Sequence, residues 1–392
     1  MTVFFRSLQV LDWLIAASWM GRVLVWRHML PRVPDLTRND YGSTLRGLPS
    51  LTVIVPARNE AANISATLKS LLAAHAITLE IIAVDDRSTD QTAMLMEKEA
   101  RLADQNFRVL RVTELPSGWL GKTHAMALAA QQATSDWLLF TDADVVFHHD
   151  ALRRALAYVV DSGADHLVLL PTLVLESWGE RMMVAFLQAL SIWAVRPWRV
   201  ADSRAKRDAI GVGAFNMIRR QVYAELGGWE ALRMEVVEDL ALGRRVKERG
   251  YAQRVALGLD LVQVRWARGA FGVVENLTKN LFALLGFRPE RLVGLAFGVA
   301  MMTLFPLFAC LGGRGLWWPT ITMVVAFFLA YERTGRYHHF SSAQVVFFPF
   351  ATLLFLYALM RSMLLALWRG GITWRGTFYS LRELRAWQKN AG

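Results

Sequence analysis

The sequence has little cysteine, and this excludes several kinds of site. Its 392 residues contain one cysteine, Cys310, which lies in an apolar run. A single cysteine cannot form an internal disulfide, and it cannot build the cysteine clusters that hold structural zinc. We therefore expect neither a disulfide framework nor a cysteine-based zinc module.

Charged residues are also scarce, at 20% of the chain, whereas hydrophobic residues make up 54% and include 15 Trp and 21 Phe. This composition is too apolar for a disordered protein and high for a soluble one, so we expect part of the chain to lie in lipid. The formal net charge of +11 leaves three explanations open. They are nucleic-acid binding, the cytoplasmic flanks of membrane helices, and a site for an anionic ligand.

Three apolar runs lie near the C-terminus. Leu292–Leu311 carries no charge and is long enough to cross a hydrocarbon core of about 30 Å. Leu316–Tyr331 is short for a span, and Ala343–Trp368 is long enough to cross. Because the tail that follows is basic, it should be cytoplasmic, which requires an even number of crossings. We therefore expect one run to be re-entrant or interfacial, with breaks at Pro306 and Pro319.

The N-terminal apolar run, Leu8–Trp26, carries Asp12 and Arg22, so it can span the membrane, lie in the interface or act as a signal anchor. We favour an uncleaved anchor, because a removable signal peptide places its positive charges before the apolar stretch. Here most of the arginines follow it. The positive-inside rule then places the next domain in the cytoplasm.

The pattern changes to that of an α/β domain between about Pro49 and Val274. Short β-rich runs alternate with helical stretches, which predicts right-handed crossovers and a mostly parallel, Rossmann-like sheet. The ligands of such sheets bind beyond the C-terminal ends of the strands. The expected strands begin at Leu51, Leu79, Phe107, Asp136 and His166.

We therefore expect five regions along the chain. They are a membrane anchor at 1–30, the α/β domain at 49–274, an amphipathic interfacial segment at 275–291, a transmembrane or re-entrant region at 292–368, and a basic cytoplasmic tail at 369–392.

Polar clusters follow three of the expected strands. The first strand ends at Pro56 and is followed by Glu60, the second ends at Asp86, and the fourth is followed by Asp142 and Asp144. Carboxylates at a strand end can hold Mg2+ or Mn2+ and bridge it to the phosphates of a nucleotide. The alternatives are helix caps for the Asp-x-Asp pair and a turn cap for Asp86.

Two glycine-containing segments are further candidates. Lys122 follows a glycine at the start of a small-residue helix, which suits an anion held by backbone N–H groups and an ammonium, or is a plain turn. Gly213 lies in Gly211–Asn216, which can form a tight turn or a floor for a sugar ring.

Acidic and basic residues complete the candidate site. Glu238 and Asp239 lie at the head of an amphipathic helix, where acids complement the helix dipole or, at an active site, take a proton from an attacking hydroxyl. Arg265 can pair with a leaving diphosphate, and Trp266 can line the site or lie in the membrane interface.

As an ordered set these motifs resemble a membrane-bound family 2 glycosyltransferase of the GT-A fold. The set is VIVPARNE, VDDRSTD, GWLGK, TDAD, GVGAFN and VEDLALGRRVKERG, and it covers about Leu51 to Gly269. The GWLGK element, the C-terminal apolar runs and the tail Thr373–Gly376 look closest to lipid-acting members, which are ceramide glucosyltransferase-like, hopanoid-associated or carotenoid-glycosylating proteins.

The resemblance implies roles for the residues at the strand ends. Asp86 would contact the nucleobase, and Pro56 and Glu60 would line the nucleotide pocket. Asp142 and Asp144 would bind the ribose, the metal and the diphosphate. A nucleotide-diphosphate sugar is thus the expected donor, with a UDP-sugar expected first and Mg2+ or Mn2+ as the cofactor.

The resemblance also implies an inverting displacement with Asp239 as the general base. One departure matters, because processive and ceramide-type members have one residue more before the Arg-Trp pair than Gln263–Trp266 provides. We therefore expect transfer of one sugar to a hydroxyl of a membrane lipid at the cytoplasmic face of the inner membrane. The alternatives are a processive polysaccharide synthase and a non-enzymatic basic module. The last explains none of the carboxylates, so we expect no nucleic-acid partner.

Overall fold

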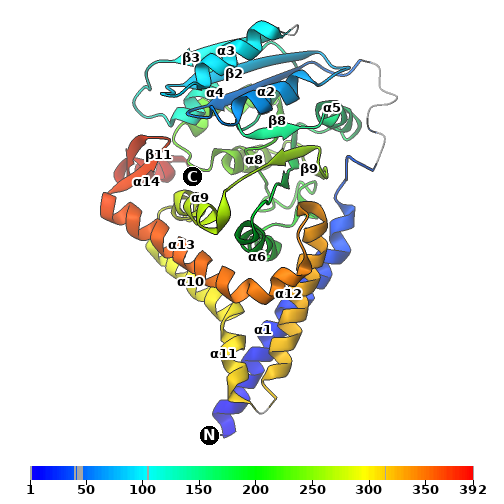
Figure 1. Ribbon diagram of the computed structural model, residues 1–392, viewed down its shortest axis with the longest axis vertical. Coiled ribbons are helices and arrows are strands. Elements are labelled where there is room, and N and C mark those ends of the chain that lie inside the picture. Colours follow the sequence, from blue (N-terminus) through cyan, green and yellow to red (C-terminus); the bar gives the residue numbers. More distant parts are fainter. Residues whose placement is uncertain (1, 39–40, 42–46, 104–105, 314, 392) are drawn as a thin grey trace.

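The computed structural model describes residues 2–38, 41, 47–103, 106–313 and 315–391. The upper half in Figure 1 is an α/β domain on a seven-stranded sheet with the order β3-β2-β1-β4-β8-β6-β9. Its strands are β1 Leu51–Ala57, β2 Leu79–Asp86, β3 Asn106–Val112, β4 Trp137–Phe140, β6 His166–Leu170, β8 Asn216–Arg219 and β9 Gln253–Leu257.

The sheet is mostly parallel, which confirms the expected fold class. β1 pairs in parallel with β2 and β4, β2 pairs in parallel with β3, and β6 pairs in parallel with β9. The exception is β8, which runs antiparallel between β4 and β6. The five expected strands are all present. β8 was not expected, and it begins at Asn216, the last residue of the GVGAFN segment. The turn expected in that segment is present at Gly213, where the N–H of Phe215 donates to the carbonyl of Val212 at 3.1 Å.

Helices cover both faces of this sheet. Successive residues of a strand point to opposite faces, so Val53 packs in one core cluster and Ile54 in the other. Because the central strands are buried on both faces, they read as continuous apolar runs. One face is covered by α2 (Ile64–Leu72), α3 (Thr92–Leu102) and α5 (Ala151–Asp161), and the other by α4 (Gly121–Gln132), α7 (Arg220–Glu225) and α8 (Glu238–Glu248).

A second, three-stranded sheet lies beside the C-terminal end of β6. Its order is β5 (Val145–Phe147), β10 (Val262–Val264) and β7 (Thr172–Leu173). The segments after β4 and β6 are thereby held against the segment that leads to Trp266.

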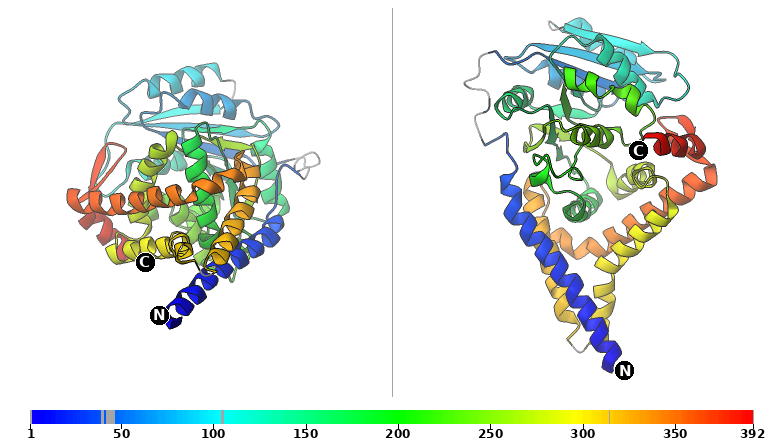
Figure 2. Two further views of the ribbon diagram at one scale, coloured as in Figure 1. Left: turned by 60° about the horizontal axis from the view of Figure 1, so that its bottom comes forward. Right: turned by 180° about the vertical axis from the view of Figure 1, so that it is seen from behind.

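Below the sheets, α6 (Trp178–Ala194) and α9 (Gly269–Leu284) pack on α13 (Phe348–Arg369). Figures 1 and 2 show α13 running across the base of the domain. A large apolar core joins these helices to the remaining ones, with Phe186, Phe282 and Phe355 among its buried side chains.

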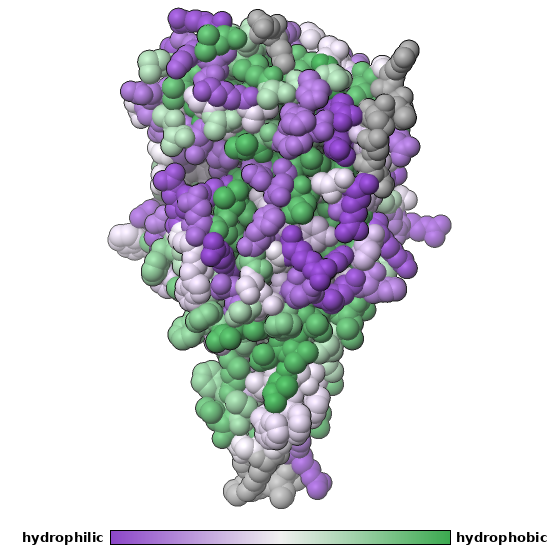
Figure 3. Space-filling view, turned by 45° about the vertical axis from the view of Figure 1, so that its right-hand side comes forward, coloured by the Kyte–Doolittle hydropathy of each residue, from purple (hydrophilic) through white to green (hydrophobic). Residues whose placement is uncertain are grey.

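The remaining helices converge toward a narrow end that also holds the N-terminus (Figures 1 and 2). They are α1 (Thr2–Met29), α10 (Pro289–Thr303), α11 (Phe305–Ala309) and α12 (Trp317–His338). In Figure 3 hydrophobic side chains gather on this narrow part, below a mainly polar upper part.

Two helical segments are long and apolar enough to cross a membrane, namely Arg6–Arg32 and Ser342–Arg369. The expected span over Leu292–Leu311 is not one straight helix, since Pro289–Thr303 and Phe305–Gly312 meet at 44°. The break lies beside Pro306, whose ring and missing N–H interrupt a helix. The break expected at Pro319 does not occur, because this proline lies in the first turn of α12.

The C-terminal tail is folded. It forms the hairpin β11 (Gly371–Trp374) and β12 (Thr377–Ser380), followed by α14 (Leu381–Ala391). Tyr379 anchors the hairpin to the domain, because its hydroxyl accepts a hydrogen bond of 3.3 Å from the N–H of Gly121. The domain boundary expected after residue 274 lies inside α9, which continues through it.

Candidate functional site

A pocket of about 390 Å³ lies between the carboxyl end of the sheet, the start of α8, α9 and the β11–β12 hairpin. It collects most of the polar side chains that the sequence singled out. Those that line it are Glu60, Lys122, Asp142, Asp144, Gly213, Glu238, Asp239 and Trp266.

Lys122 forms ion pairs with two carboxylates that line the pocket, one from the segment after β4 and one from α8. Its Nζ lies 2.6 Å from Asp142 Oδ1 and 2.6 Å from Glu238 Oε1. Burial lowers the pKa of the Lys122 ammonium, but the two carboxylates outweigh burial and raise it above its ordinary value. The lysine is therefore charged and neutralises acids that come from β4 and α8.

Asp142 and Asp144 lie just beyond β4. Burial opposes the ionisation of Asp142, but the Lys122 ammonium outweighs it and lowers the pKa of Asp142. Burial, with the negative charges of Asp142 and Glu60, raises the pKa of Asp144 to about 7. Gly213 makes room for Asp142, since a Cβ there would lie 2.5 Å from Asp142 Oδ2.

These acids are suited to hold a divalent cation whose remaining ligands would come from a bound diphosphate. Carboxylate oxygens are the ligands that Mg2+ and Mn2+ prefer, and Mg2+ commonly takes one or two carboxylates together with substrate phosphates. Asp142 and Glu60 repel the negative form of Asp144 and so help to raise its pKa. A bound cation would offset this repulsion. Among the described residues, the one trio with ligand atoms within 4.8 Å of one another is elsewhere, at His75, His149 and Asp150.

Asp239 is placed by the backbone around it. It is the second residue of α8, and its carbonyl oxygen accepts a hydrogen bond of 3.3 Å from the side-chain amide of Asn216 on β8. Gly211 is packed against the same carbonyl, since a Cβ there would lie 1.8 Å from it. Burial and the negative charge of Glu238 raise the pKa of Asp239 to about 7. A carboxylate with this pKa can accept a proton near neutral pH.

Three predicted site residues do not line this pocket. Pro56 is buried inside β1. Asp86 is buried at the end of β2, where its Oδ1 accepts a hydrogen bond of 2.8 Å from Nε of Arg87. The role predicted for Asp86 in base recognition stays a prediction.

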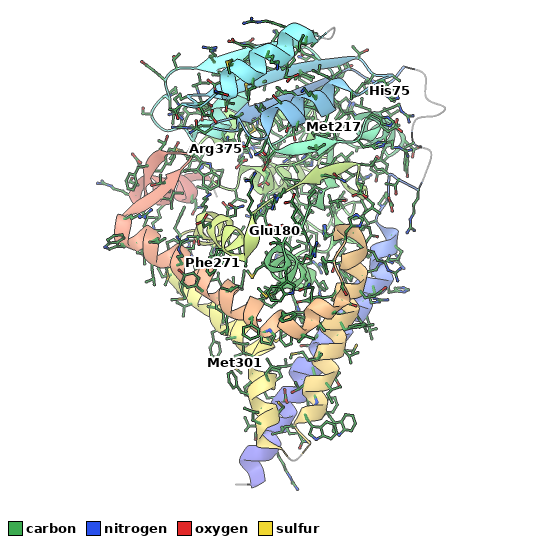
Figure 4. All side chains as sticks on the ribbon, viewed as in Figure 1. His75, Glu180, Met217, Phe271, Met301 and Arg375 are labelled. Carbon is green, nitrogen blue, oxygen red and sulfur yellow. The ribbon has the colours of Figure 1, made fainter. Side chains whose placement is uncertain are left out.

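Arg265 is the third of these residues, and its charge is already matched. Its guanidinium lies 2.6 Å from a carboxylate oxygen of Glu176 and 3.2 Å from one of Glu180. Glu180 closes the capping box of α6 with Ser177. Arg265 thus ties the segment after β10 to Glu180 at the start of α6, which is labelled in the middle of Figure 4. Arg265 does not line the pocket.

Arg375 is a pocket residue that the sequence did not single out for a role. It lies at the turn of the β11–β12 hairpin, with φ at +45°, and lines the pocket beside Trp374. Its Nη1 is buried and has no hydrogen-bond partner among the described residues. A non-glycine residue at positive φ is uncommon and clusters at functional sites. Figure 4 shows Arg375 reaching in from the hairpin toward the domain.

Asn280 of α9 also lines the pocket, and its Oδ1 is buried without a partner among the described residues. Neither Arg375 nor Asn280 follows a strand of the main sheet, so polar residues at the strand ends do not include them. The signal in the sequence was the tail motif Thr373–Gly376, which the resemblance singled out without assigning a role.

Comparison with known proteins agrees with this geometry. A protein-family model described as Glycosyl transferase family 2 matches residues 52–227. The chain is 24% identical over 347 residues to a 4,4'-diaponeurosporenoate glycosyltransferase of Staphylococcus aureus, covering 85% of this chain and 89% of that one. The namesake of Staphylococcus haemolyticus is 25% identical over 237 residues, covering 59% and 61%.

The fold is similar to that of a mannosyltransferase from Pyrobaculum calidifontis in complex with GDP-Man and Mn2+. The TM-score is 0.53 at 17% identity, over 92% of this chain and 99% of that one. Residues 52–227 therefore match the Glycosyl transferase family 2 model, and the fold around them is of the GT-A type.

Proposed function

We propose that the protein is an inverting glycosyltransferase that moves one sugar from a nucleotide-diphosphate sugar to a hydroxyl of a membrane lipid. The observation that carries the proposal is one pocket that holds a phosphate side and a proton-accepting side. Asp142, Asp144 and Lys122 form the first, and Asp239 forms the second. The lipid acceptor is supported by the apolar helices below the pocket and by the carotenoid-acting relative.

The chemistry follows from these positions. Asp239 takes the proton from the acceptor hydroxyl as its oxygen attacks the anomeric carbon, and the nucleoside diphosphate leaves on the opposite side. A Mg2+ or Mn2+ ion on Asp142 and Asp144 would supply positive charge to the diphosphate. Arg375, whose Nη1 has no protein partner among the described residues, takes the part of the basic side chain that we first expected of Arg265.

The charge centre of the pocket then changes partners during binding. Lys122 neutralises Asp142 and Glu238 at 2.6 Å each. With a cation and a diphosphate bound, Asp142 would hold the cation, and the Lys122 ammonium would be free to contact a phosphate oxygen. Glu238, Gly213 and Trp266 line the same space and face the sugar, and the unpaired Asn280 oxygen accepts a hydrogen bond from a sugar hydroxyl.

A single transfer is favoured over a processive synthase. Arg265 and the residues before it do not form the processive motif, and Arg265 is committed to Glu176 and Glu180. The described residues also contain few candidate spans. The arginines that follow α1 favour a cytoplasmic catalytic domain at the inner membrane, where UDP-sugars are the expected donors.

The test is lipid mass spectrometry of cells that express the wild-type chain, Asp239→Asn or the remote surface variant Asp161→Asn. We expect one hexose-shifted lipid with the wild type and with Asp161→Asn. Asp239→Asn should lose the product and still bind the donor, measured by titration of the purified protein with UDP-sugars. An active Asp239→Asn variant would remove this residue as the base, and no shifted lipid with the wild type would overturn the function.

A further inference from the structure

A second cavity lies on the membrane side of the catalytic pocket. It has a volume of about 280 Å³ and is enclosed by α1, α6 and α12 together with the segments that follow β6 and β9. Its lining includes Trp26 of α1, Ser191 of α6 and Tyr337 of α12. The α/β domain contributes residues such as Leu170 and Leu259. The described helices thus leave a space where the domain meets the narrow apolar end of the molecule.

This cavity shares a wall with the catalytic pocket. Pro171, Leu173 and Val212 line both spaces. Val212 lies between Gly211, which packs on the Asp239 carbonyl, and Gly213, which packs on Asp142. Asp239 and Asp142 therefore lie on the catalytic side of the wall that the two spaces share.

Several polar groups in the lining of the cavity already have hydrogen-bond partners. The Ser191 hydroxyl donates to the carbonyl of Gln188 at 2.7 Å, and the Thr334 hydroxyl donates to that of Ala330 at 2.9 Å. Thr172 accepts a hydrogen bond of 2.9 Å from the N–H of Asp260. His338 Nδ1 accepts a hydrogen bond of 3.1 Å from the N–H of Leu173, and the side chains of Gln188 and Tyr337 also border the space. The other lining residues are mainly apolar, so the space suits a mainly apolar ligand.

The volume limits what this ligand can be. About 280 Å³ lies at the lower end of the range of about 300–1,000 Å³ that is typical of small-molecule pockets. One extended hydrocarbon or polyene chain fits such a space better than the paired chains of a diacyl lipid.

We propose that this cavity binds the apolar chain of a single-chain acceptor lipid, which enters from the bilayer beside α1 and α12 and presents its hydroxyl past Val212 to Asp239. The inference rests on the proposed function, because it assigns the acceptor side of the same reaction.

The experiment measures sugar transfer to a series of single-chain alcohols, hexanol, decanol and hexadecanol, and to dioleoylglycerol. Burial of each methylene favours binding, so kcat/KM should rise by up to about fourfold per added methylene until the cavity is full. Dioleoylglycerol should be a poor acceptor. Equal rates for all alcohols, or a preference for dioleoylglycerol, would overturn the proposal.

Two variants locate the effect. Ser191→Trp fills the cavity from α6, and Ala194→Trp adds the same side chain at an exposed position of the same helix. We expect Ser191→Trp to lower kcat/KM for hexadecanol at least tenfold and to leave UDP-sugar binding and hydrolysis of the donor by water unchanged. Ala194→Trp should behave as the wild type, and equal loss in both variants would count against the cavity.

Tyr337→Ala is an independent test in case Ser191→Trp misfolds, because it enlarges the cavity without adding atoms. It should move the optimum of the series to longer or bulkier alcohols, and an unchanged optimum would contradict the proposal. The results that would contradict the proposed function differ from those that would contradict the cavity. A wild type that transfers sugar to no lipid defeats the proposed function, whereas transfer that ignores both cavity variants defeats only the cavity.

Discussion

The charge of Lys122 balances two carboxylates in the pocket. Its ammonium is the counter-charge to Asp142 and Glu238, each 2.6 Å away and each on a different element. Removal of one partner from a buried ion pair leaves an uncompensated charge, which costs about 3–5 kcal/mol. We therefore expect the lysine to be needed for stability as well as for the proposed donor binding.

Lys122→Gln should unfold at a lower denaturant concentration than the wild type. Lys122→Arg, which keeps the charge, should lie between the two. Lys98→Gln, at an exposed position of α3, is the control and should match the wild type. The measurement is tryptophan fluorescence of detergent-solubilised protein during titration with urea, and equal midpoints for Lys122→Gln and the control would show that the pair is not stabilising.

Asp239 should set the pH dependence of the reaction. The base form is the carboxylate, so kcat/KM should rise with pH through an apparent pKa of about 7 and level off above it. The charged groups around it are Glu238, Lys122 and Asp142. Glu238→Gln removes the negative neighbour that raises the pKa of Asp239, so the rise should move to lower pH.

Glu248→Gln, at the exposed end of the same helix, provides the control for this profile and should leave it unchanged. The measurement is the initial rate of transfer at fixed low acceptor concentration across the pH range. A rise at the same pH in the wild type and Glu238→Gln would assign the titration to another group.

The sequence placed some residues well and others not. Asp142, Asp144 and Asp239 directly follow a strand or begin a helix, and topology alone carries such positions to one edge of the sheet. The position of Arg265 outside the pocket could not be predicted, because both of its acidic partners come from a segment about 85 residues earlier in the chain. A motif states which side chain is present, but its pairing depends on packing.

At the scale of elements, the β11–β12 hairpin is the main addition. It is fastened by Tyr379 to the start of α4, and by Thr377 to the Arg58 guanidinium, which donates a hydrogen bond of 3.2 Å to its hydroxyl. These contacts hold Arg375 over the pocket from a part of the chain more than 100 residues beyond the matched family domain.

Arg375→Ala should lower kcat about 10²–10³-fold, which is the typical loss when one preorganised group that stabilises developing charge is removed. Arg382→Ala, at an exposed position of α14, is the control and should keep the wild-type rate. Single-turnover assays with a UDP-sugar check this, because they separate chemistry from product release. An unchanged rate for Arg375→Ala would show that the leaving diphosphate is stabilised by other groups.

The elements that the sequence predicted correctly are those with strong local signals. The doubly buried strands and α2 have continuous or helix-spaced apolar residues. β8 has only four residues after a glycine-rich segment, and its pairing is decided by the space between β4 and β6. Likewise, a hydropathy profile shows that Leu292–Leu311 is apolar, but it carries no information about the bend between the two helices there.

At the scale of the whole molecule, the narrow end gives a direct test of orientation. If α10–α11 and α12 cross the bilayer as a pair, the turn between them lies on the side opposite the catalytic domain. Leu311, at this turn, is 81% exposed. The lone cysteine, Cys310, is adjacent and has to be replaced by serine before a reporter is introduced.

Leu311→Cys in a Cys310→Ser background should react with a membrane-impermeant maleimide added to intact cells or spheroplasts. Lys98→Cys in the same background lies on the domain and should react only after permeabilisation. Gel-shift detection of the adduct measures both. Protection of Leu311→Cys until permeabilisation would mean that the narrow end does not reach the far side.

The convergence of α1, α11 and α12 also has a mechanical consequence (Figure 2). If the narrow end crosses the bilayer, a body that is broad under the catalytic domain and tapers away from it would take up more lateral area in the near leaflet than in the far one. Its insertion would then produce an asymmetric lateral pressure profile, which lipids with small headgroups in the near leaflet would relieve. The density of such lipids would then tune how much enzyme a membrane accommodates, independently of the supply of donor or acceptor.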